Sequence, residues 1–356
     1  MTNGQIVLEY FQGMLVESPK RTIIRNWPSF ERIKGARVAL CVGIFDGIHR
    51  GHLSLFNVVR ELSTDFAGIP LIFTFENHPL TVLEPTRPIK YLTLPDEKIH
   101  LLHRFGFDYI ACFRFTRPFS QMTAQEFLER IKNFCDLRAV VVGYDAVIGH
   151  DRAHTDEQFK RLARAVGFEF IRIPMVKAND KPVSSRAIRE AVMNGDIALA
   201  NKMLVYPFFV RGKVVAGKGI GEKMLKFPTA NIVVPPEKIL PPVGIYAGSF
   251  RREGRHTASA LCVSEPGRVP LFLKSVDSEN SQVIKETESQ MRLVEAHVIG
   301  KRLSLKETTA EFIFLERLRD WQEFESPEEL RRRINEDVTE SIRVFEKHRL
   351  NLQFLP

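Results

Sequence analysis

Short apolar runs alternate with amphipathic stretches through the first half of the chain. Five runs have the length and composition of buried strands: Val38–Val42, Leu71–Phe75, Tyr109–Phe113, Ala139–Val142 and Phe168–Ile173. Four segments with helical spacing of apolar positions lie among them: Arg50–Ser63, Asp96–Phe105, Ala124–Phe134 and Asp156–Val166. This βα alternation predicts a Rossmann-like α/β domain, with a parallel sheet, helices on both of its faces and right-handed crossovers.

The pattern changes after a helix that we predict over Ala187–Leu204. Six strand-like runs follow with glycine and proline turns and no helices between them: Phe208–Val215, Ile232–Val234, Ile245–Phe250, Ala258–Val263, Leu293–Val298 and Ala310–Leu315. Such a series predicts an antiparallel β-barrel. An amphipathic segment over Pro327–Lys347 predicts a closing helix. We therefore expect two domains, residues 1–200 and 201–356, while residues 1–36 have no legible role.

Composition agrees with a globular protein of two domains. The chain has 356 residues, of which 44% are hydrophobic and 26% charged, which argues against disorder. Its formal net charge of +8 fits anionic partners such as nucleotides, nucleic acid or a membrane face, and does not choose among them. The four cysteines are far apart without metal-binding spacing, Met1–Gly13 lacks the apolar core of a signal peptide, and no apolar run approaches the length of a membrane span. We expect a cytoplasmic protein with no membrane partner.

The segment Val38–Leu55 holds the densest group of candidate site residues: Gly43, Phe45, Asp46, Gly47, His49, Gly51 and His52. A strand, a glycine-bearing turn and a helix start together form a phosphate site, because free N–H groups and the positive end of the helix dipole meet there. Two imidazoles three residues apart in a first helical turn can project to the same side. The structural alternative is that both histidines cap or pack the helix start.

Candidate residues also follow other predicted strands. His78 comes after the second strand, and Asp145 and Arg152 come after the fourth. Because ligands bind at the carboxyl ends of the strands in open parallel sheets, these residues are expected near the first group. For His78 alone, packing would be an equal alternative.

Two serines precede the predicted helix that begins at Ala187. Ser184 and Ser185 are good N-cap residues, and their hydroxyls can also hold a pyrophosphate. Arg189, one turn further, can bridge phosphate oxygens. A capped surface helix with a solvated arginine is the structural alternative.

The run from Gly43 to His52 resembles the signature of HxGH nucleotidyltransferases, and more closely their flavin branch, the prokaryotic bifunctional riboflavin kinase/FAD synthetases. The resemblance extends over residues 36–340 and implies adenylyl transfer from ATP to FMN, giving FAD and pyrophosphate. It places His49 and His52 at the phosphates, Ser184 and Arg189 at the leaving pyrophosphate, and Asp145 and Arg152 in a flavin-contacting loop. The sequence departs from the family pattern at Ile44, Asn77, His154 and Arg186.

The second half resembles the riboflavin kinase domain of the same family. The matching motifs are Phe227–Asn231, Pro241–Tyr246, Val294–His297 and a segment beginning at Leu318–Arg319. They imply that Thr229 and Asn231 hold Mg²⁺, that Glu295 is the catalytic base, and that Arg319 lies beside the flavin. Gly217 and Gly219 belong to the implied phosphate loop, which carries Glu222 and Lys226 where a basic residue and a glycine are usual.

Two further family segments are missing from this half of the chain. An active kinase and a degenerate barrel kept for structure or flavin binding therefore both remain open. In either case the expected ligands are Mg²⁺, ATP, FMN, FAD and riboflavin. An HxGH enzyme for another phosphate substrate is a further alternative, against which the barrel motifs argue. We expect no nucleic-acid partner, and a monomer or weak homo-oligomer.

Overall fold

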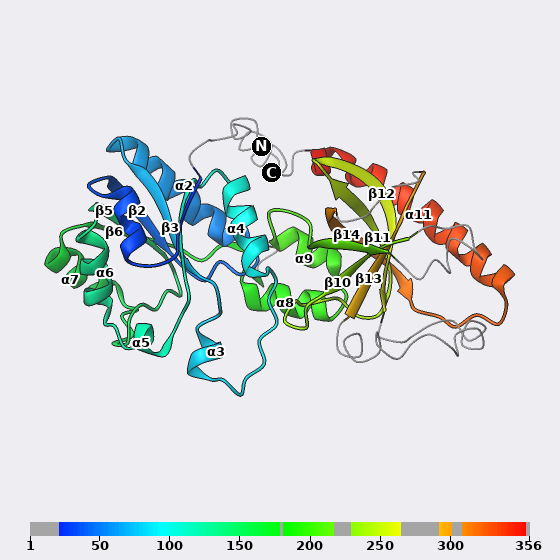
Figure 1. The fold of residues 1–356 in the computed structure, drawn as a ribbon, viewed down its shortest axis with the longest axis horizontal. Coiled ribbons are helices and arrows are strands. Elements are labelled where there is room, and N and C mark those ends of the chain that lie inside the picture. The colour runs from blue at the N-terminus through cyan, green and yellow to red at the C-terminus, as the bar shows by residue number, and fades with distance from the viewer. Residues whose placement is uncertain (1–20, 179–180, 217–228, 265–291, 301–307, 354–356) are drawn as a thin grey trace. The chain divides into compact units, whose positions relative to one another are not determined.

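The computed structural model describes residues 21–178, 181–216, 229–264, 292–300 and 308–353. The chain forms two compact units, of which the first ends at Ser185 and the second begins at Arg186 (Figure 1). Both parts of the predicted fold class are confirmed, since a parallel α/β sheet is followed by a closed antiparallel barrel and a final helix. The predicted domain boundary at residue 200 stays a prediction.

A six-stranded parallel sheet forms the centre of the first unit. Its strands are β1 (Thr22–Ile24), β2 (Arg37–Val42), β3 (Ile69–Phe75), β4 (Tyr109–Phe113), β5 (Asp136–Gly143) and β6 (Glu169–Ile173). They lie in the order β1-β4-β3-β2-β5-β6. The five predicted strands are confirmed. The edge strand β1 was missed, because three residues are too few to show a period.

Helices cover both faces of this sheet, as predicted. The helices α2 (Arg50–Asp65) and α4 (Pro95–Arg104) lie on one side, and α6 (Ala124–Lys132) and α7 (Asp156–Val166) on the other (Figure 1). The shorter elements are η1 (Pro28–Ile33), α3 (Leu80–Leu83), α5 (Arg117–Ser120) and the small strands β7 (Lys177–Ala178) and β8 (Lys181–Pro182). The α6 and α7 face is filled with aromatic rings; Trp27 contacts Phe73, Phe113 and Phe127.

The strand order creates a switch point beside β2. From β2 the chain moves outward to β3 and β4, and then returns to β5 on the other side of β2. The segments that leave β2 and β5 therefore start side by side at the carboxyl edge of the sheet. In open α/β sheets this is where ligands bind.

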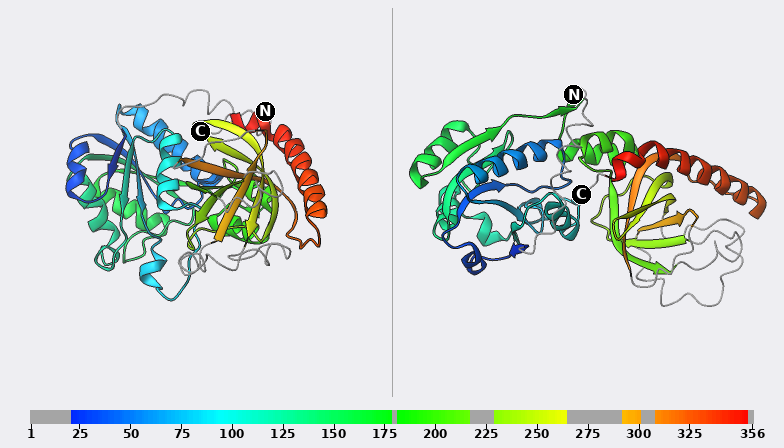
Figure 2. Two further views of the ribbon diagram at one scale, coloured as in Figure 1. Left: turned by 45° about the vertical axis from the view of Figure 1, so that its right-hand side comes forward. Right: turned by 90° about the horizontal axis from the view of Figure 1, so that it is seen from above.

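The second unit is built on a closed barrel in the strand order β10-β13-β12-β11-β14-β9. The strands are β9 (Phe209–Ala216), β10 (Thr229–Val234), β11 (Gly244–Arg252), β12 (Arg255–Ser264), β13 (Arg292–Val298) and β14 (Thr309–Asp320). The final helix α11 (Pro327–Gln353) runs along the outside and contacts β11, β12 and β14 (Figures 1 and 2). All six predicted strands and the closing helix are confirmed.

The single helix predicted over Ala187–Leu204 is wrong, because the chain forms two helices there. They are α8 (Ser185–Met193) and α9 (Ile197–Met203), separated at Gly195, which has a φ of 76°. Only a residue without a Cβ adopts such an angle easily, so glycine ends the first helix. The Asp196 side chain then caps the second by accepting a hydrogen bond from the Leu199 N–H at 2.9 Å.

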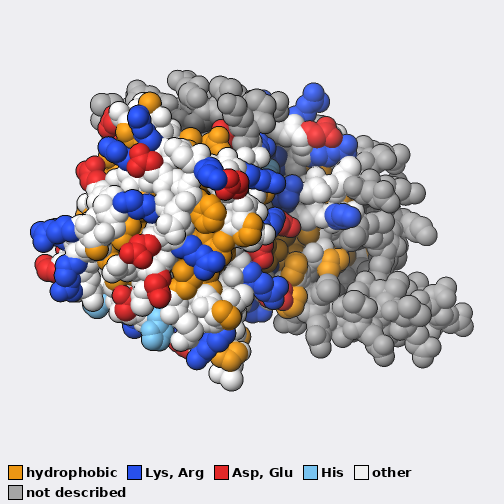
Figure 3. Space-filling model, turned by 60° about the vertical axis from the view of Figure 1, so that its left-hand side comes forward, with side chains coloured by type: hydrophobic (Ala, Val, Ile, Leu, Met, Phe, Trp, Pro, Cys, Tyr) orange, Lys and Arg blue, Asp and Glu red, His pale blue; other side chains and the backbone are white. Residues whose placement is uncertain are grey.

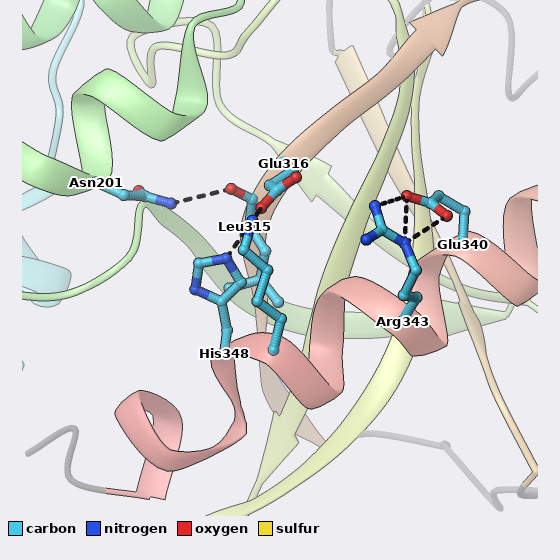
Figure 4. A network of polar contacts seen from close by, with 7 residues as sticks. Asn201, Leu315, Glu316, Glu340, Arg343 and His348 are labelled. Carbon is cyan, nitrogen blue, oxygen red and sulfur yellow. Dashed lines mark hydrogen bonds and ion pairs between the residues drawn. The ribbon is translucent and has the colours of Figure 1, made fainter.

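Asn201 fastens α9 to the barrel. Its Nδ2 donates to the Phe314 carbonyl at 2.9 Å and to the Leu315 carbonyl at 3.4 Å, the second of which is drawn in Figure 4. Its Oδ1 accepts from the Phe208 N–H at 2.7 Å. Glu316, next along β14, accepts from His348 of α11 at 3.1 Å. Because these bonds tie both helices to the same strand, α9 and α11 pack as parts of the barrel unit.

The surface shows mixed charge. On the face of the first unit in Figure 3, lysine and arginine side chains lie among acidic and hydrophobic ones. Among the residues coloured there, the basic groups form no continuous stripe of the kind typical of nucleic-acid-binding surfaces. Within the described ranges, no helix is both long enough and apolar enough to cross a bilayer.

Candidate active site

The turn after β2 has an unusual backbone that its residue types permit. Phe45 has a positive φ of 51°, and its buried ring packs so closely on Gly43 that a Cβ there would lie 2.7 Å from the ring. Gly47 has a φ of 63°, and a Cβ there would lie 2.6 Å from Leu92. The two glycines are therefore required by the shape of the turn. The turn leads into α2 at the carboxyl edge of the sheet.

His49 and His52 cap the start of α2 reciprocally. The Nδ1 of His49 accepts from the backbone N–H of His52 at 3.3 Å, and the Nδ1 of His52 accepts from that of His49 at 3.4 Å. Their rings stack with centroids 3.6 Å apart. The two imidazoles thus lie together, as the spacing predicted. Because each Nδ1 is an acceptor, each neutral ring carries its proton on Nε2 and keeps an N–H donor.

Burial keeps both rings neutral. Desolvation lowers the pKa of His49 to about 4, although the nearby Asp46 opposes this shift. Desolvation, His49 and the Lys98 ammonium all lower the pKa of His52, to well below its usual value. At neutral pH the pair is therefore uncharged and offers hydrogen-bond donors rather than cations.

Polar side chains from distant segments hold the turn in place. The Thr93 N–H donates to Asp46 Oδ1 at 2.9 Å, and the Gly47 N–H donates to the Thr93 hydroxyl at 3.0 Å. The Ser185 hydroxyl donates to the Asp46 carbonyl at 2.7 Å. Thr93 thus braces the turn, and the neighbouring Leu94 is the N-cap residue of α4. Ser185 joins the same site, 139 residues along the chain.

Two further bracing residues were not among the predicted site residues. The Lys98 ammonium is buried and donates to the carbonyls of Ile44 and Phe75 at 3.1 and 2.5 Å. The Thr74 hydroxyl also donates to the Ile44 carbonyl, at 3.0 Å. A threonine inside the apolar run of β3 was the available signal for Thr74. For Lys98 the signal was a lysine between apolar positions of an amphipathic helix.

His78 follows β3, the neighbour of β2 in the sheet. Its Nδ1 accepts from the Leu80 N–H at 3.2 Å, and its backbone N–H donates to the Tyr91 hydroxyl at 3.0 Å. Asn77, which stands where the family has proline, exchanges hydrogen bonds with the backbone of Phe115 at 2.8 and 3.1 Å. The amide therefore ties the loop after β3 to the loop after β4, which supplies rigidity by another route.

Asp145 and Arg152 lie on the loop after β5, next to the β2 turn in strand order. Both side chains are exposed, and Arg152 has a positive φ of 53°. His154, in the place of a family glycine, donates from Nδ1 to the Arg152 carbonyl at 2.8 Å. The Nδ1–H donor satisfies that carbonyl, so the histidine supports the bend at Arg152.

Ser184 immediately precedes α8, and Arg189 lies one turn after Ser185 on that helix. The Nε atom of Arg189 is buried. Arg186, where the family has threonine, is 87% exposed and pairs with Glu190 at 3.0 Å. The added cation therefore lies on the helix surface. Arg189 belongs to the second unit by its packing, while Ser184 and Ser185 belong to the first.

Three of the predicted kinase residues, Asn231, Glu295 and Arg319, lie on one belt across the barrel strands, whereas Thr229 lies opposite His297. Asn231 and Cys262 both lie opposite Glu295, from β10 and β12. Val294 and Ala296 are fully buried inside the barrel, so Glu295 between them points to the outer face. The sheet register, which the sequence does not display, brings these three residues together.

The belt continues to α11. Ile245 of β11 lies opposite Cys262, and Arg319 of β14 lies opposite Ile245. Arg319 forms a bidentate pair with Asp337 of α11 at 2.9 and 2.6 Å. Arg319, predicted beside the flavin, is thus held by a carboxylate on the helix that covers this face. Gly217 and Gly219 lie outside the described residues.

Burial also shapes the titration of this belt. Desolvation raises the pKa of Glu295 above its usual value. Burial and the Glu295 carboxylate raise the pKa of the Cys262 thiol to about 12. Glu295 is consequently a stronger proton acceptor than an exposed carboxylate, and Cys262 stays protonated beside it.

The fold and the two groups of residues define a transferase class. The first unit of this chain carries the His49 and His52 pair at the switch point of the sheet, as in a nucleotidyltransferase. The second unit carries the Glu295 carboxylate on the outer face of the barrel, under helix α11. Family models match both: FAD synthetase over residues 32–187 and riboflavin kinase over residues 204–345. The chain belongs to the family of bifunctional riboflavin kinase/FMN adenylyltransferases.

Curated relatives with that name agree along the chain. The protein of Buchnera aphidicola (Acyrthosiphon pisum) is 28% identical over 92% of this chain and 99% of its own length. That of Listeria monocytogenes is 31% identical over 60% of this chain and 68% of its own. The protein of Bacillus subtilis is 25% identical over 87% of this chain and 93% of its own length.

A solved structure has the same two-part fold. It is described as a macrolide-efflux protein from Streptococcus pneumoniae, and it aligns with a TM-score of 0.73 at 26% identity. The alignment covers 89% of this chain and 96% of that one. The riboflavin kinase match, together with the bifunctional relatives, favours the two-activity interpretation over a degenerate barrel.

Proposed function

We propose that this protein makes FAD from riboflavin in two ATP-dependent steps. The barrel unit phosphorylates riboflavin to FMN, and the first unit transfers AMP from ATP to FMN with release of pyrophosphate. The observation that supports the second step most strongly is the stacked, neutral, reciprocally capped pair of His49 and His52. Family membership supports both steps.

For adenylyl transfer the protein must position FMN and ATP and supply hydrogen-bond donors to their phosphates. An oxygen of the FMN phosphate attacks the α-phosphorus of ATP, and the bond to pyrophosphate breaks. Because the attacking oxygen is already anionic, no general base is needed. His49 and His52 direct their Nε2–H donors to the phosphates, where charge shifts in the transition state. Ser184, Ser185 and Arg189 hold the leaving pyrophosphate.

The acceptor lies over the neighbouring strand ends. The loop after β5 carries Asp145 and Arg152 beside the β2 turn, and His78 follows the strand on the other side of β2. With Gly43, Phe45 and Asp46 shaping the turn itself, we place ATP across β2 and the flavin toward β5. Gly51, in the first turn of α2, leaves room for the His49 ring, because a Cβ there would lie 3.1 Å from the His49 Cε1 atom.

The kinase step differs because its nucleophile is a hydroxyl. The terminal ribityl hydroxyl of riboflavin must lose a proton as it attacks the γ-phosphorus, and the bond between the γ-phosphorus and the oxygen of ADP breaks. Glu295 accepts that proton, and its raised pKa suits a general base. Arg319 orients the flavin. The family resemblance assigns Gly217 and Gly219, which lie outside the described residues, to the phosphate loop for ATP.

Residues of β10 fit a magnesium ion. Thr229 and Asn231 lie two residues apart, so their side chains share a face. Asn231 is 3% exposed, and its Oδ1 has no hydrogen-bond partner among the residues that the structure describes. A buried oxygen donor of this kind suits Mg²⁺, which prefers oxygen ligands and keeps phosphates among them. When bound, the ion would neutralise phosphate charge.

One assay tests both steps. Purified full-length protein is given Mg²⁺–ATP with riboflavin, and separately with FMN, and the products are resolved by chromatography. We expect FMN and FAD from riboflavin, and FAD with pyrophosphate from FMN. The absence of FAD in the second reaction would refute adenylyl transfer, and FAD from FMN without FMN from riboflavin would refute the kinase step alone.

We further propose a cytoplasmic protein that acts on small molecules as a monomer or weak homo-oligomer. Cys41, Cys112 and Cys135 are free, buried thiols, which suits a reducing compartment. Fractionation of cells and sedimentation of the purified protein test the two parts. Secretion or a tight oligomer would contradict them.

A further inference from the structure

Arg172 of β6 is a largely buried arginine that none of the predicted motifs contains. Its side chain is 16% exposed. Its Nη1 donates to the carbonyls of Gly143 and Tyr144 at 3.1 and 3.0 Å, and its Nη2 donates to the carbonyl of His154 at 2.7 Å. Its Nε donates to Asp156 at 2.5 Å. One guanidinium thus holds both ends of the segment from Gly143 to His154.

Two aromatic rings fix the orientation of this guanidinium. Phe159 and Phe170 stack on each other with centroids 4.9 Å apart and an interplanar angle of 4°. The Arg172 Cζ lies 5.2 and 5.7 Å from their centroids. Because the guanidinium is planar and its donors form a fixed fork, its place against the rings also fixes the carbonyls that it binds.

The middle of the segment has separate anchors. Ile148 and Ala153 exchange backbone hydrogen bonds at 3.0 and 2.9 Å. Asp151 accepts from the Ala124 N–H of α6 at 2.8 Å. The stretch that carries Asp145 lies between this anchored middle and Gly143. Within the described part of the chain, the hydrogen bonds from Arg172 to the carbonyls of Gly143 and Tyr144 hold the residues that directly precede Asp145.

We propose that Arg172 is a positioning residue for the FMN acceptor. By fixing Gly143, Tyr144 and His154, it holds Asp145 and Arg152 where the flavin phosphate must be presented to ATP. This inference rests on the proposed adenylyl transfer. It assigns Arg172 no contact with the reacting atoms, so its loss should affect acceptor binding before it affects turnover.

The test compares Arg172→Met, Arg172→Lys and the control Arg161→Met in the full-length protein. Arg161 is an exposed arginine on α7 of the same unit. In Arg172→Met we expect the KM for FMN to rise roughly tenfold, with kcat and the KM for Mg²⁺–ATP within about twofold. Arg172→Lys keeps the positive charge but lacks the forked donors of the guanidinium, so its KM for FMN should rise less than that of Arg172→Met. Arg161→Met should match the parent.

A second readout follows the segment itself. Trypsin cleaves after arginine, and Arg152 is exposed, so we expect faster cleavage after Arg152 in Arg172→Met than in the control. If Arg172→Met does not fold, Arg172→Lys keeps the test decisive through its KM for FMN.

The outcomes separate this inference from the proposed function. A parent protein that makes no FAD from FMN refutes the proposed function, and the positioning role with it. An active parent whose Arg172 variants keep its KM for FMN, or lose kcat alone, overturns the positioning role and leaves the proposed function standing.

Discussion

The two units present opposite kinds of titratable group to a phosphate reaction. In the first, burial makes His49 and His52 neutral donors at the pH of the cell. In the second, burial makes Glu295 a better proton acceptor. The same physical cause, desolvation, therefore prepares one site to give hydrogen bonds and the other to take a proton.

This difference follows the nucleophile that each proposed step uses. A phosphate oxygen needs no deprotonation, so the first unit can work without a base. A ribityl hydroxyl must lose its proton, so the second unit requires a carboxylate as the base. The bracing differs as well: side chains from three distant segments hold the β2 turn, whereas the barrel belt depends on strand register and on α11.

The largest effect is expected from a substitution that removes the proposed base, Glu295. Glu295→Gln keeps the shape of the side chain but cannot accept the proton, so riboflavin phosphorylation should fall by about 10² to 10⁴-fold. FAD formation from supplied FMN should not change. Initial rates of both reactions measure this. The exposed Glu253, changed to glutamine, is the matched control, and equal loss of both activities would contradict the assignment.

The reciprocal variant removes one donor from the histidine pair. His49→Asn retains a residue that caps helices well but loses the Nε2–H, so FAD formation should fall by about 10² to 10³-fold. Riboflavin phosphorylation in the same preparation serves as the control. A variant that forms FAD at the parental rate would show that the imidazole caps α2 and does nothing more.

The neutral histidine should also make stability depend on pH. The pKa of His49 is about 4 in the folded protein against 6.5 for an ordinary histidine, so the unfolded chain binds the proton first as pH falls. This favours unfolding increasingly below pH 6.5, until the folded form is also protonated near pH 4. For this group the free energy of unfolding should drop by about 2 kcal/mol between pH 7 and pH 5.

Urea unfolding of the parent and of His49→Asn at both pH values measures that drop. The variant should lose less stability than the parent over this interval. Equal losses would mean that His49 is protonated in the folded protein, which would remove the contrast between the two sites.

The smallest effect concerns a departure from the family pattern. Arg186→Thr restores the usual residue, but Arg186 is exposed and pairs with Glu190 on the surface. Exposed pairs of this type contribute about 0.5 kcal/mol or less, and FAD formation should stay within about twofold. A large gain in rate would show that the threonine hydroxyl, and not the helix start alone, serves the first site.

Periodicity sufficed for most of the fold. Parallel strands buried on both faces are continuous apolar runs, and the helices between them repeat at 3.6 residues, so both kinds of element were legible locally. It failed where length or a single backbone angle decided the outcome. The three residues of β1 carry no period, and Gly195 divides α8 from α9 inside an otherwise helical pattern.

The histidine pair was equally legible, because its geometry arises within one helical turn. The residues that brace it were not. Lys98 and Thr74 meet the Ile44 carbonyl across 54 and 30 residues of chain, and Arg172 reaches Gly143 across 29. Nothing in the spacing of such residues shows that their strands are neighbours, since strand order is set by packing of the whole sheet.

By itself, the sequence determined the two-part architecture, the helix start at His49 and His52, and the alternation that turns Glu295 away from the barrel interior. Each depends on residues close together in the chain. Tertiary structure alone decided that the imidazoles are neutral, that Asn231 and Cys262 flank Glu295, and that Arg172 closes the loop after β5. Desolvation and strand register arise only when segments far apart in the chain exclude water and pair.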